Sequence, residues 1–140
     1  MRKPVLVLMG VLTLVVPGCG TSVNSTASVA GTWVGTMTDS VLGTGKIYAT
    51  ISQSDSVLSG EWYSYYPNPI NNFQGTLSGS VSGSSVAAML TSNFPILLRR
   101  EPQDCDFNVT ATVNGNQLSG TYASVFCNVA VTGSIHLTRK

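Results

Sequence analysis

The sequence is poor in charged side chains and contains a single histidine, although it is 140 residues long. Charged residues make up 9% of the chain, and seven Lys or Arg are balanced by six Asp or Glu. Because nucleic-acid binding relies on clustered basic residues, we expect no nucleic-acid partner. The one histidine, His136, lies between Ile135 and Leu137 on the polar parity of an alternating segment. We interpret it as a surface side chain rather than a catalytic base or a metal ligand.

Other patterns that carry chemistry are missing from the sequence as well. No helical periodicity is found, so no glycine loop stands before a helix where it would hold a phosphate. Hydroxyl side chains are abundant, yet the pattern places no base beside any of them. We therefore expect a protein that is not an enzyme and that uses neither a metal nor another cofactor.

The sequence also lacks an apolar run long enough to cross a bilayer as a helix. The uncharged run at residues 5–16 spans about 12 residues, whereas a membrane-spanning helix needs ~20. This run follows the basic start Met1-Arg2-Lys3 and precedes residues 17–20, which read Pro-Gly-Cys-Gly. A basic start followed by an apolar run of this length is typical of a secretory signal peptide.

The end of this leader resembles the lipobox of bacterial lipoprotein precursors, in which an aliphatic residue and small residues precede a lipidated cysteine. Val16, Gly18 and Cys19 match that pattern. The resemblance implies that residues 1–18 are a signal peptide and that Cys19 becomes the mature N-terminus, carrying acyl chains such as palmitate. An ordinary secretory leader is the alternative. Gly20, in place of an acidic residue, indicates outer-membrane retention.

Removal of the leader changes the charge of the chain. Without residues 1–18, five basic residues (seven minus Arg2 and Lys3) face six acidic ones, and the net charge is −1. Residues 19–29 have no periodic pattern, and we interpret them as the lipidated cysteine and a flexible tether. Residues 30–140 then form one domain that is large enough for a single core. We expect this domain in the cell envelope, anchored to a membrane through its lipid, on the periplasmic or surface face.

Cysteine is scarce too, with three in the chain. The lipid would use Cys19, which leaves Cys105 and Cys127 as an even pair in an oxidising compartment. A hairpin that turns near residues 114–117 places residue 105 opposite residues 124–126, close to Cys127. We therefore expect a disulfide between Cys105 and Cys127 that closes the open end of this hairpin. Two free thiols are the alternative.

What the sequence has in abundance is the periodicity of β-strands. In residues 107–113 every second side chain is apolar, which indicates a strand with one buried face. Residues 114–116 read Asn-Gly-Asn and suit a tight turn. A returning strand repeats the alternation, and a third strand continues it from Val129 to Leu137. The C-terminal part of the chain therefore predicts an antiparallel meander.

A short motif recurs along the chain, with an apolar residue, a hydroxyl residue, glycine, any residue and a second apolar residue. Its four copies begin at Leu58, Leu77, Leu118 and Val131. In each copy the glycine shares the parity of the apolar residues, so we expect it to face the core. There it permits a large neighbour or a sharp bend of the strand. Glycines that admit a ligand to the backbone are the alternative.

One apolar row per strand gives eight strands, joined mostly by short connections. The rows are marked by Trp33, Ile47, Leu58, Leu77, Val86, Val109, Leu118 and Val131. Short connections favour antiparallel neighbours, and eight such strands can close on themselves and remove their edges. We therefore predict an all-β domain, an eight-stranded antiparallel up-and-down barrel that is round or flattened. An open two-sheet sandwich is the competing arrangement.

The ends of the domain resemble the calycin superfamily, which comprises lipocalins, fatty-acid-binding proteins and avidins. Residues 31–33 read Gly-Thr-Trp, and Arg139 lies just beyond the last apolar row. The resemblance implies a calycin-like barrel in which Trp33 packs beside Arg139 and closes the base. The polar ligand set of avidins is missing, because Gly35 and Asp39 occupy that region. We therefore expect no biotin site.

The aromatic run at residues 62–66 is the strongest candidate for a contact surface. Trp62 has core parity, whereas Tyr63 and Tyr65 point outward, and tyrosines at a strand end suit sugars, peptides or partner proteins. Cross-strand aromatic packing is an equally good interpretation. We take Trp62, Tyr63, Tyr65 and Tyr66 as the candidate binding surface.

The segment between Pro95 and Pro102 breaks the alternation. It gathers apolar residues first and charged residues after them. We interpret it as an irregular strand or as a loop that folds over one mouth of the barrel.

Together these features predict a lipid-anchored envelope protein with a non-catalytic binding role. In one mode, a small apolar ligand occupies the barrel. In the other, the protein is an inhibitor or partner-binding protein that acts through Tyr63, Tyr65 and the loops at residues 68–72 or 96–100. Small lipid-anchored barrels that inhibit lysozyme or metalloproteases have a similar architecture. An interior cavity of about 300 Å³ or more favours the first mode, and a filled interior favours the second.

Overall fold

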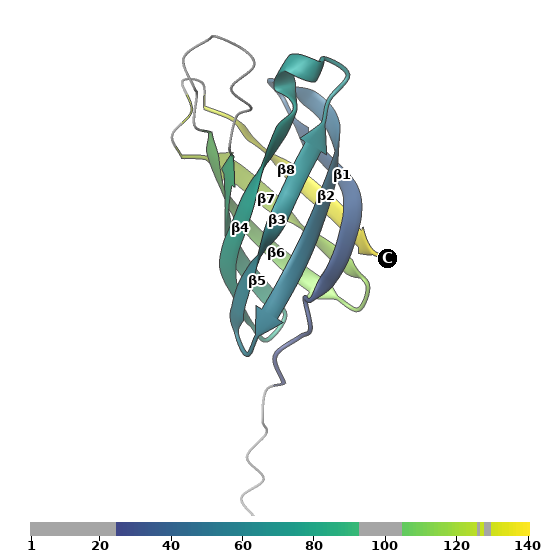
Figure 1. Cartoon of the computed structure of the whole chain (residues 1–140), viewed down its shortest axis with the longest axis vertical. Coiled ribbons are helices and arrows are strands. Elements are labelled where there is room, and N and C mark those ends of the chain that lie inside the picture. The colour runs from purple at the N-terminus through teal and green to yellow at the C-terminus, as the bar shows by residue number, and fades with distance from the viewer. Residues whose placement is uncertain (1–24, 93–104, 126, 128–129) are drawn as a thin grey trace, which may run out of the picture.

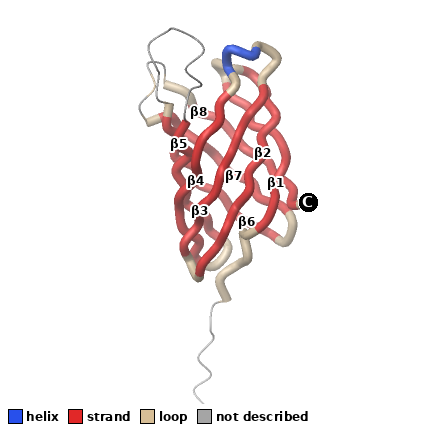
Figure 2. Tube along the Cα trace, viewed as in Figure 1, coloured by secondary structure: helices blue, strands red, loops and turns tan. Residues whose placement is uncertain are grey.

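The structure, a computed structural model, describes residues 25–92, 105–125, 127 and 130–140. Within them the chain forms eight strands and one 3-10 helix. Figure 2 shows the strands in red and the helix in blue. The elements are β1 (Gly31–Asp39), β2 (Gly43–Ser54), β3 (Val57–Tyr65), η1 (Pro69–Asn71), β4 (Phe73–Ser82), β5 (Ser85–Ser92), β6 (Asp106–Asn114), β7 (Gln117–Ser124) and β8 (Thr132–Arg139). The predictions for the leader, for Cys19 and for the segment between Pro95 and Pro102 fall outside the described residues.

The eight strands form one closed barrel (Figure 1). Each strand pairs antiparallel with the next, and β8 returns to pair with β1 from Trp33 opposite Arg139 to Asp39 opposite Gly133. This last ladder closes the sheet, so the predicted up-and-down barrel is confirmed and the open sandwich is excluded. Closure also pairs the outer edge of β1, which would otherwise present free backbone groups.

The alternation of the strands separates an apolar interior from a polar outer wall. Inward-facing side chains on every strand are buried, and the largest of them are Trp33, Trp62, Phe107, Met37, Ile47 and Leu58. Aromatic rings meet across the interior. The ring centroids of Phe107 lie 6.1 Å from Trp62, 5.7 Å from Phe73 and 5.8 Å from Tyr122, and each pair is T-shaped. Such edge-to-face contacts add to the hydrophobic effect of burying the rings.

The recurring glycines face inward where the wall leaves no room for a side chain. In the fourth copy of the motif, a Cβ on Gly133 would lie 2.3 Å from the carbonyl oxygen of Thr38 and 2.6 Å from the ring of Tyr122. The expected role of admitting a large neighbour is therefore present at this position, and glycine also allows a close approach of the neighbouring strand.

The predicted disulfide between Cys105 and Cys127 is present, with a Cα–Cα distance of 4.7 Å. It joins the residue before β6 to the connection that follows β7. Ser92 supports the same corner, because its hydroxyl donates to the Cys105 carbonyl at 2.5 Å and accepts from the Cys105 N–H at 3.1 Å. The open end of the β6–β7 hairpin is thus closed covalently.

The chain enters the barrel through residues 25–30, hereafter the strap, which lie at the lower end in Figure 1. Val29 is fully buried, and its N–H donates to Gln53 Oε1 at 2.6 Å. The Ala27 N–H donates to the Gly83 carbonyl at 2.8 Å, and the Gln53 amide donates to the Ala27 carbonyl at 3.2 Å. These contacts fasten the strap to the lower end of the barrel.

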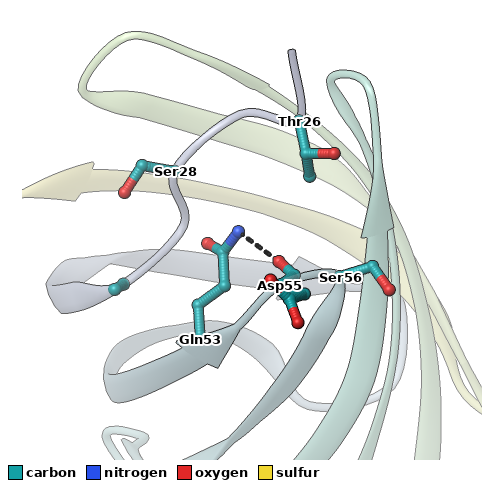
Figure 3. A pocket seen from close by; sticks show the side chains of 6 residues that line it. Thr26, Ser28, Gln53, Asp55 and Ser56 are labelled. Carbon is teal, nitrogen blue, oxygen red and sulfur yellow. Dashed lines mark hydrogen bonds between the residues drawn. The ribbon is translucent and has the colours of Figure 1, made fainter. Parts of the chain in front are cut away.

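The strap corrects one sequence-based expectation. The pattern of residues 19–29 predicts a flexible tether, whereas the structure packs Ala27 and Val29 against the barrel core. The reason lies in Gln53, the last inward position of β2, which offers its amide to the passing backbone. Figure 3 shows Gln53 beside the strap, with its amide nitrogen also donating to the Asp55 carbonyl at 2.9 Å. The packed domain therefore begins by residue 27.

At the lower end, the start of β1 lies beside the end of β8. The guanidinium carbon of Arg139 lies 4.7 Å from the centroid of the Trp33 ring. Arg139 Nη2 donates to the Ser28 carbonyl, and Trp33 Nε1 donates to the Val29 carbonyl at 2.8 Å. The contact between Trp33 and Arg139 that the calycin resemblance implies is therefore present, and it also holds the strap.

Candidate binding surface

The barrel interior is almost completely filled. The cavity inside it has a volume of about 30 Å³ and is lined by apolar side chains from all strands except β1. Ligand pockets have volumes of roughly 300–1,000 Å³. The cavity in this barrel is about as large as the volume that one water molecule occupies in liquid water. The described interior therefore has no room for a small apolar ligand, and a candidate binding site has to be sought on the outer surface.

The aromatic run at residues 62–66 divides between the two faces of β3. Tyr63 and Tyr65 are 42% and 53% exposed, whereas Trp62 and Tyr66 are 1% and 6% exposed. Because side chains alternate along a strand, residues 62, 64 and 66 share the inward face. The prediction that all four residues form a binding surface is therefore wrong for Trp62 and Tyr66, which belong to the interior.

The two exposed tyrosines join a third one to form a cluster on the outer face of β2 and β3. Tyr48, the half-buried cross-strand partner of Tyr63, stacks on it with ring centroids 4.8 Å apart. Tyr65 meets Tyr63 edge to face at 5.5 Å and Tyr48 at 6.3 Å. We call Tyr48, Tyr63 and Tyr65 the tyrosine cluster. Cross-strand packing is therefore present, and it holds the rings in a fixed arrangement while two of them remain exposed.

Charged side chains border the tyrosine cluster. Lys46 lies directly opposite Tyr65, and Glu61 lies two residues before Tyr63 on the same outward face of β3. Both are exposed. The outward positions of β4–β7 are mostly Ser, Thr, Asn and Gln instead. An aromatic centre with a polar and charged rim is the arrangement of a protein interface.

A hydrogen-bonded pair of side chains, Asp39 and Tyr122, lies inside the barrel at its upper end, away from the strap. Tyr122 Oη donates to Asp39 Oδ2 at 2.7 Å, and Asp39 Oδ1 accepts from the N–H groups of Val41 and Leu42 at 2.8 and 2.5 Å. Asp39 is 8% exposed. From the sequence it was noted only because it stands in the region where avidins carry their polar ligand set. Its carboxylate shapes the β1–β2 turn and holds the Tyr122 phenol.

Burial changes the acidity of two phenols at this end. It raises the pKa of Tyr66 to about 12, since an ionised phenolate would be poorly solvated there. Burial also raises the pKa of Tyr122, and the hydrogen bond to Asp39 adds to the effect because it requires the protonated phenol. Both groups are therefore neutral hydrogen-bonding groups at pH 7.

His136, the one histidine of the chain, is exposed on β8, as the polar parity of its position predicts. In the part of the chain that the structure describes, no three His, Cys, Asp or Glu residues come together as a metal site, and no helix is long and apolar enough to span a bilayer.

Sequence reasoning missed three residues of these sites. Tyr48 was identifiable, because the register of the hairpin that turns at residues 54–57 places it opposite Tyr63. Gln53 also gave a signal, since it is a polar residue at the end of an apolar row. The pairing of Asp39 with Tyr122 spans 83 residues and has no local signature.

No protein-family model matches the sequence, and no curated protein matches it significantly. The function is therefore inferred from the chain's own sequence and geometry.

Proposed function

We propose that the protein is a non-catalytic partner-binding protein of the cell envelope, which binds another envelope protein through the tyrosine cluster. The observation that carries this proposal is the exposure of aromatic side chains on the wall of a barrel whose interior is filled. Tyrosine offers a large apolar ring and a polar hydroxyl, and it is enriched among the residues that dominate binding energy.

The alternative carrier role is less well supported. A carrier of small apolar molecules needs an interior some ten times larger than the cavity of about 30 Å³ found here. The aromatic rings of Trp62, Phe73 and Phe107 occupy the space that such a ligand would need. Surface binding, in the manner of an inhibitor, is the mode that this interior favours.

The envelope location rests on the N-terminal sequence. The basic start, the apolar run and the lipobox-like residues ending at Cys19 support export followed by lipidation. The disulfide between Cys105 and Cys127 agrees with an oxidising compartment. Mass spectrometry of the mature protein tests this part: we expect an acylated residue 19, and an intact leader or an unmodified Cys19 contradicts it.

The same proposal includes a calycin-like barrel. The closed eight-stranded barrel and the packing of Arg139 on Trp33 support it. Among small barrels of similar architecture, the filled interior favours the inhibitors of lysozyme or metalloproteases over the carriers as functional analogues. The analogy concerns architecture, and the partner has to be identified from the surface.

The test compares partner capture by matched variants. Tyr63→Ala/Tyr65→Ala removes the exposed rings, while Thr112→Ala/Ser119→Ala changes a cross-strand pair on the opposite wall and serves as the control. We expect a defined envelope protein to co-purify with the native chain and the control but not with the tyrosine variant. A photo-crosslinker at position 63 should join the same partner. Equal capture by all three proteins rejects the tyrosine cluster as the binding surface.

A further inference from the structure

The exposed charges of the barrel wall lie on two sides of the tyrosine cluster. Among the Asp, Glu, Lys and Arg residues of the described strands, the exposed ones are Lys46 on β2 and Glu61 on β3, one of each sign. These two strands are paired, and they run side by side in Figure 1. Neither side chain forms an ion pair with the described chain, so both charges are available to another molecule.

The register of β2 and β3 fixes where these charges lie relative to the rings. Tyr48 stands directly opposite Tyr63. Lys46 lies two residues from this pair towards the upper end of the barrel, and Glu61 lies two residues from it towards the lower end. Two residues of a strand span ~7 Å, so the two charges lie at similar distances on opposite sides of the pair. The surface therefore has a positive end and a negative end, with the stacked tyrosines midway between them.

Such a surface is complementary to itself. In a twofold dimer the same patch of both copies meets, so that each contact between two different residues is made twice. Consider a twofold axis that lies in the interface, passes over the Tyr48–Tyr63 pair and runs perpendicular to the line from Lys46 to Glu61. This axis places the lysine of each copy over the glutamate of the other. Two contacts between opposite charges then form together, and the tyrosines of both copies meet between them.

The tyrosines supply the apolar centre of this contact. Tyr63 and Tyr65 are about half exposed, and their rings already meet edge to face with centroids 5.5 Å apart. Because packing on the wall restricts the rings beforehand, association costs little side-chain entropy. Exposed ion pairs stabilise a contact only weakly. The rings therefore contribute most of the affinity, whereas the charges select the orientation and the partner.

We propose that the tyrosine cluster, Lys46 and Glu61 form the interface of a twofold homodimer. The wall of a barrel is convex, so the buried area is smaller than the roughly 1,200–2,000 Å² of stable complexes, and we expect a dissociation constant in the high micromolar range. The homodimer itself does not require an envelope partner. One consequence rests on the proposed function: both contacts use the same rings, so the partner has to displace the second copy.

The experiment measures self-association of the mature chain, residues 19–140, with Cys19→Ser, which removes acyl chains as a separate cause of association. Sedimentation equilibrium gives the mass, and amide NMR on dilution locates the contact. We expect the mass to rise towards that of a dimer with concentration. Dilution should shift the amides of residues 46–50 and 61–65 and leave those of the β6–β7 hairpin in place. Tyr63→Ala/Tyr65→Ala should stay monomeric.

Exchange of the charges decides whether the named residues face each other. Lys46→Glu alone and Glu61→Lys alone each bring like charges together twice, so each should weaken association at least tenfold. An equimolar mixture of these two variants joins an acidic patch to a basic one and should associate at least as tightly as the native chain. The double variant Lys46→Glu/Glu61→Lys should also dimerise like the native chain. Lys140→Glu makes the same charge change at an exposed position outside the patch and should have no effect.

Three results overturn the homodimer: a native chain that stays monomeric up to about 1 mM, charge variants that associate as the native chain does, or a mixture no tighter than its components. The measurement uses purified protein alone, so its failure is distinct from a failure to capture a partner from envelope extract. Addition of the captured partner should lower the fraction of dimer. A dimer that persists with the partner bound contradicts the shared surface.

Discussion

Arg139 connects three parts of the molecule at the residue scale. Its guanidinium covers the Trp33 ring, its Nη2 bonds the strap at Ser28, and its backbone N–H donates to the Asn116 carbonyl in the β6–β7 turn at 2.8 Å. One side chain thus links the first strand, the last strand and the segment that precedes the barrel. A planar guanidinium can stack and bond at once, which an ammonium cannot do equally well.

Replacement of this residue should weaken the lower end. Arg139→Met keeps much of the aliphatic stem but loses the cation–π contact and the bond to the strap, so we expect a loss of about 1–2 kcal/mol in unfolding free energy. The emission of Trp33 should also shift. Urea unfolding followed by fluorescence measures both, and Lys140→Met is the control at a neighbouring exposed position. Identical unfolding curves for the two variants would contradict the role of Arg139.

Tyr66 and Tyr122 make a residue-scale prediction about pH. Because folding raises the pKa of Tyr66 to about 12 and raises that of Tyr122 too, the folded state holds protons that the unfolded chain releases near pH ~10. The associated stability is complete below pH ~10 and is lost as the pH rises towards 12. Unfolding free energies measured between these values should fall more gently in Tyr66→Phe than in Tyr65→Phe, an exposed control. Parallel slopes would refute this account.

The β6–β7 hairpin is the element most dependent on a covalent link. Loss of the disulfide in Cys105→Ser/Cys127→Ser should lower the unfolding free energy by about 3 kcal/mol, since it frees a loop that spans 22 residues in sequence. Equilibrium unfolding in urea checks the magnitude, with the reduced native chain as a second comparison. Two reactive thiols in the denatured, unreduced protein would disprove the bond itself.

The same element shows what alternation can predict. The apolar parity of Val109, Ala111 and Val113, with a turn near residue 115, was enough to place Cys105 near Cys127, because strand pairing propagates register from a turn. Parity also indicated that Trp62 would point inward. Gln53 shows the limit: its partners are backbone atoms of the strap, and no periodic pattern marks such contacts.

At the scale of the whole molecule, closure of the barrel followed from strand number and short connections, whereas the volume inside did not. Interior space depends on how rings from different strands interlock, as Phe107 does with Trp62 and Tyr122. The Asp39–Tyr122 bond joins the first and seventh strands and arises only once the barrel is closed. Neither the interior volume nor the Asp39–Tyr122 bond can be predicted from a short stretch of the sequence.

A filled barrel leads to a prediction about ligands. The native protein should not bind benzene or a fatty acid in its interior, because the cavity of about 30 Å³ is too small. Phe107→Ala should lower stability by about 3–5 kcal/mol and create an apolar space that admits benzene. Thermal shift and NMR with benzene compare the two proteins. Fatty-acid binding by the native chain would restore the carrier hypothesis.

The strap gives the domain a mechanical property. If the protein is anchored through Cys19, tension between membrane and partner reaches the barrel through residues 25–30. A few bonds, such as Val29 to Gln53 and Ala27 to Gly83, hold this segment, whereas β1 is held by complete ladders on both sides. The strap therefore peels away first and frees a segment whose fully extended length is at most ~20 Å while the barrel stays folded. A pull on the bound partner is absorbed as slack before it can extract the first strand.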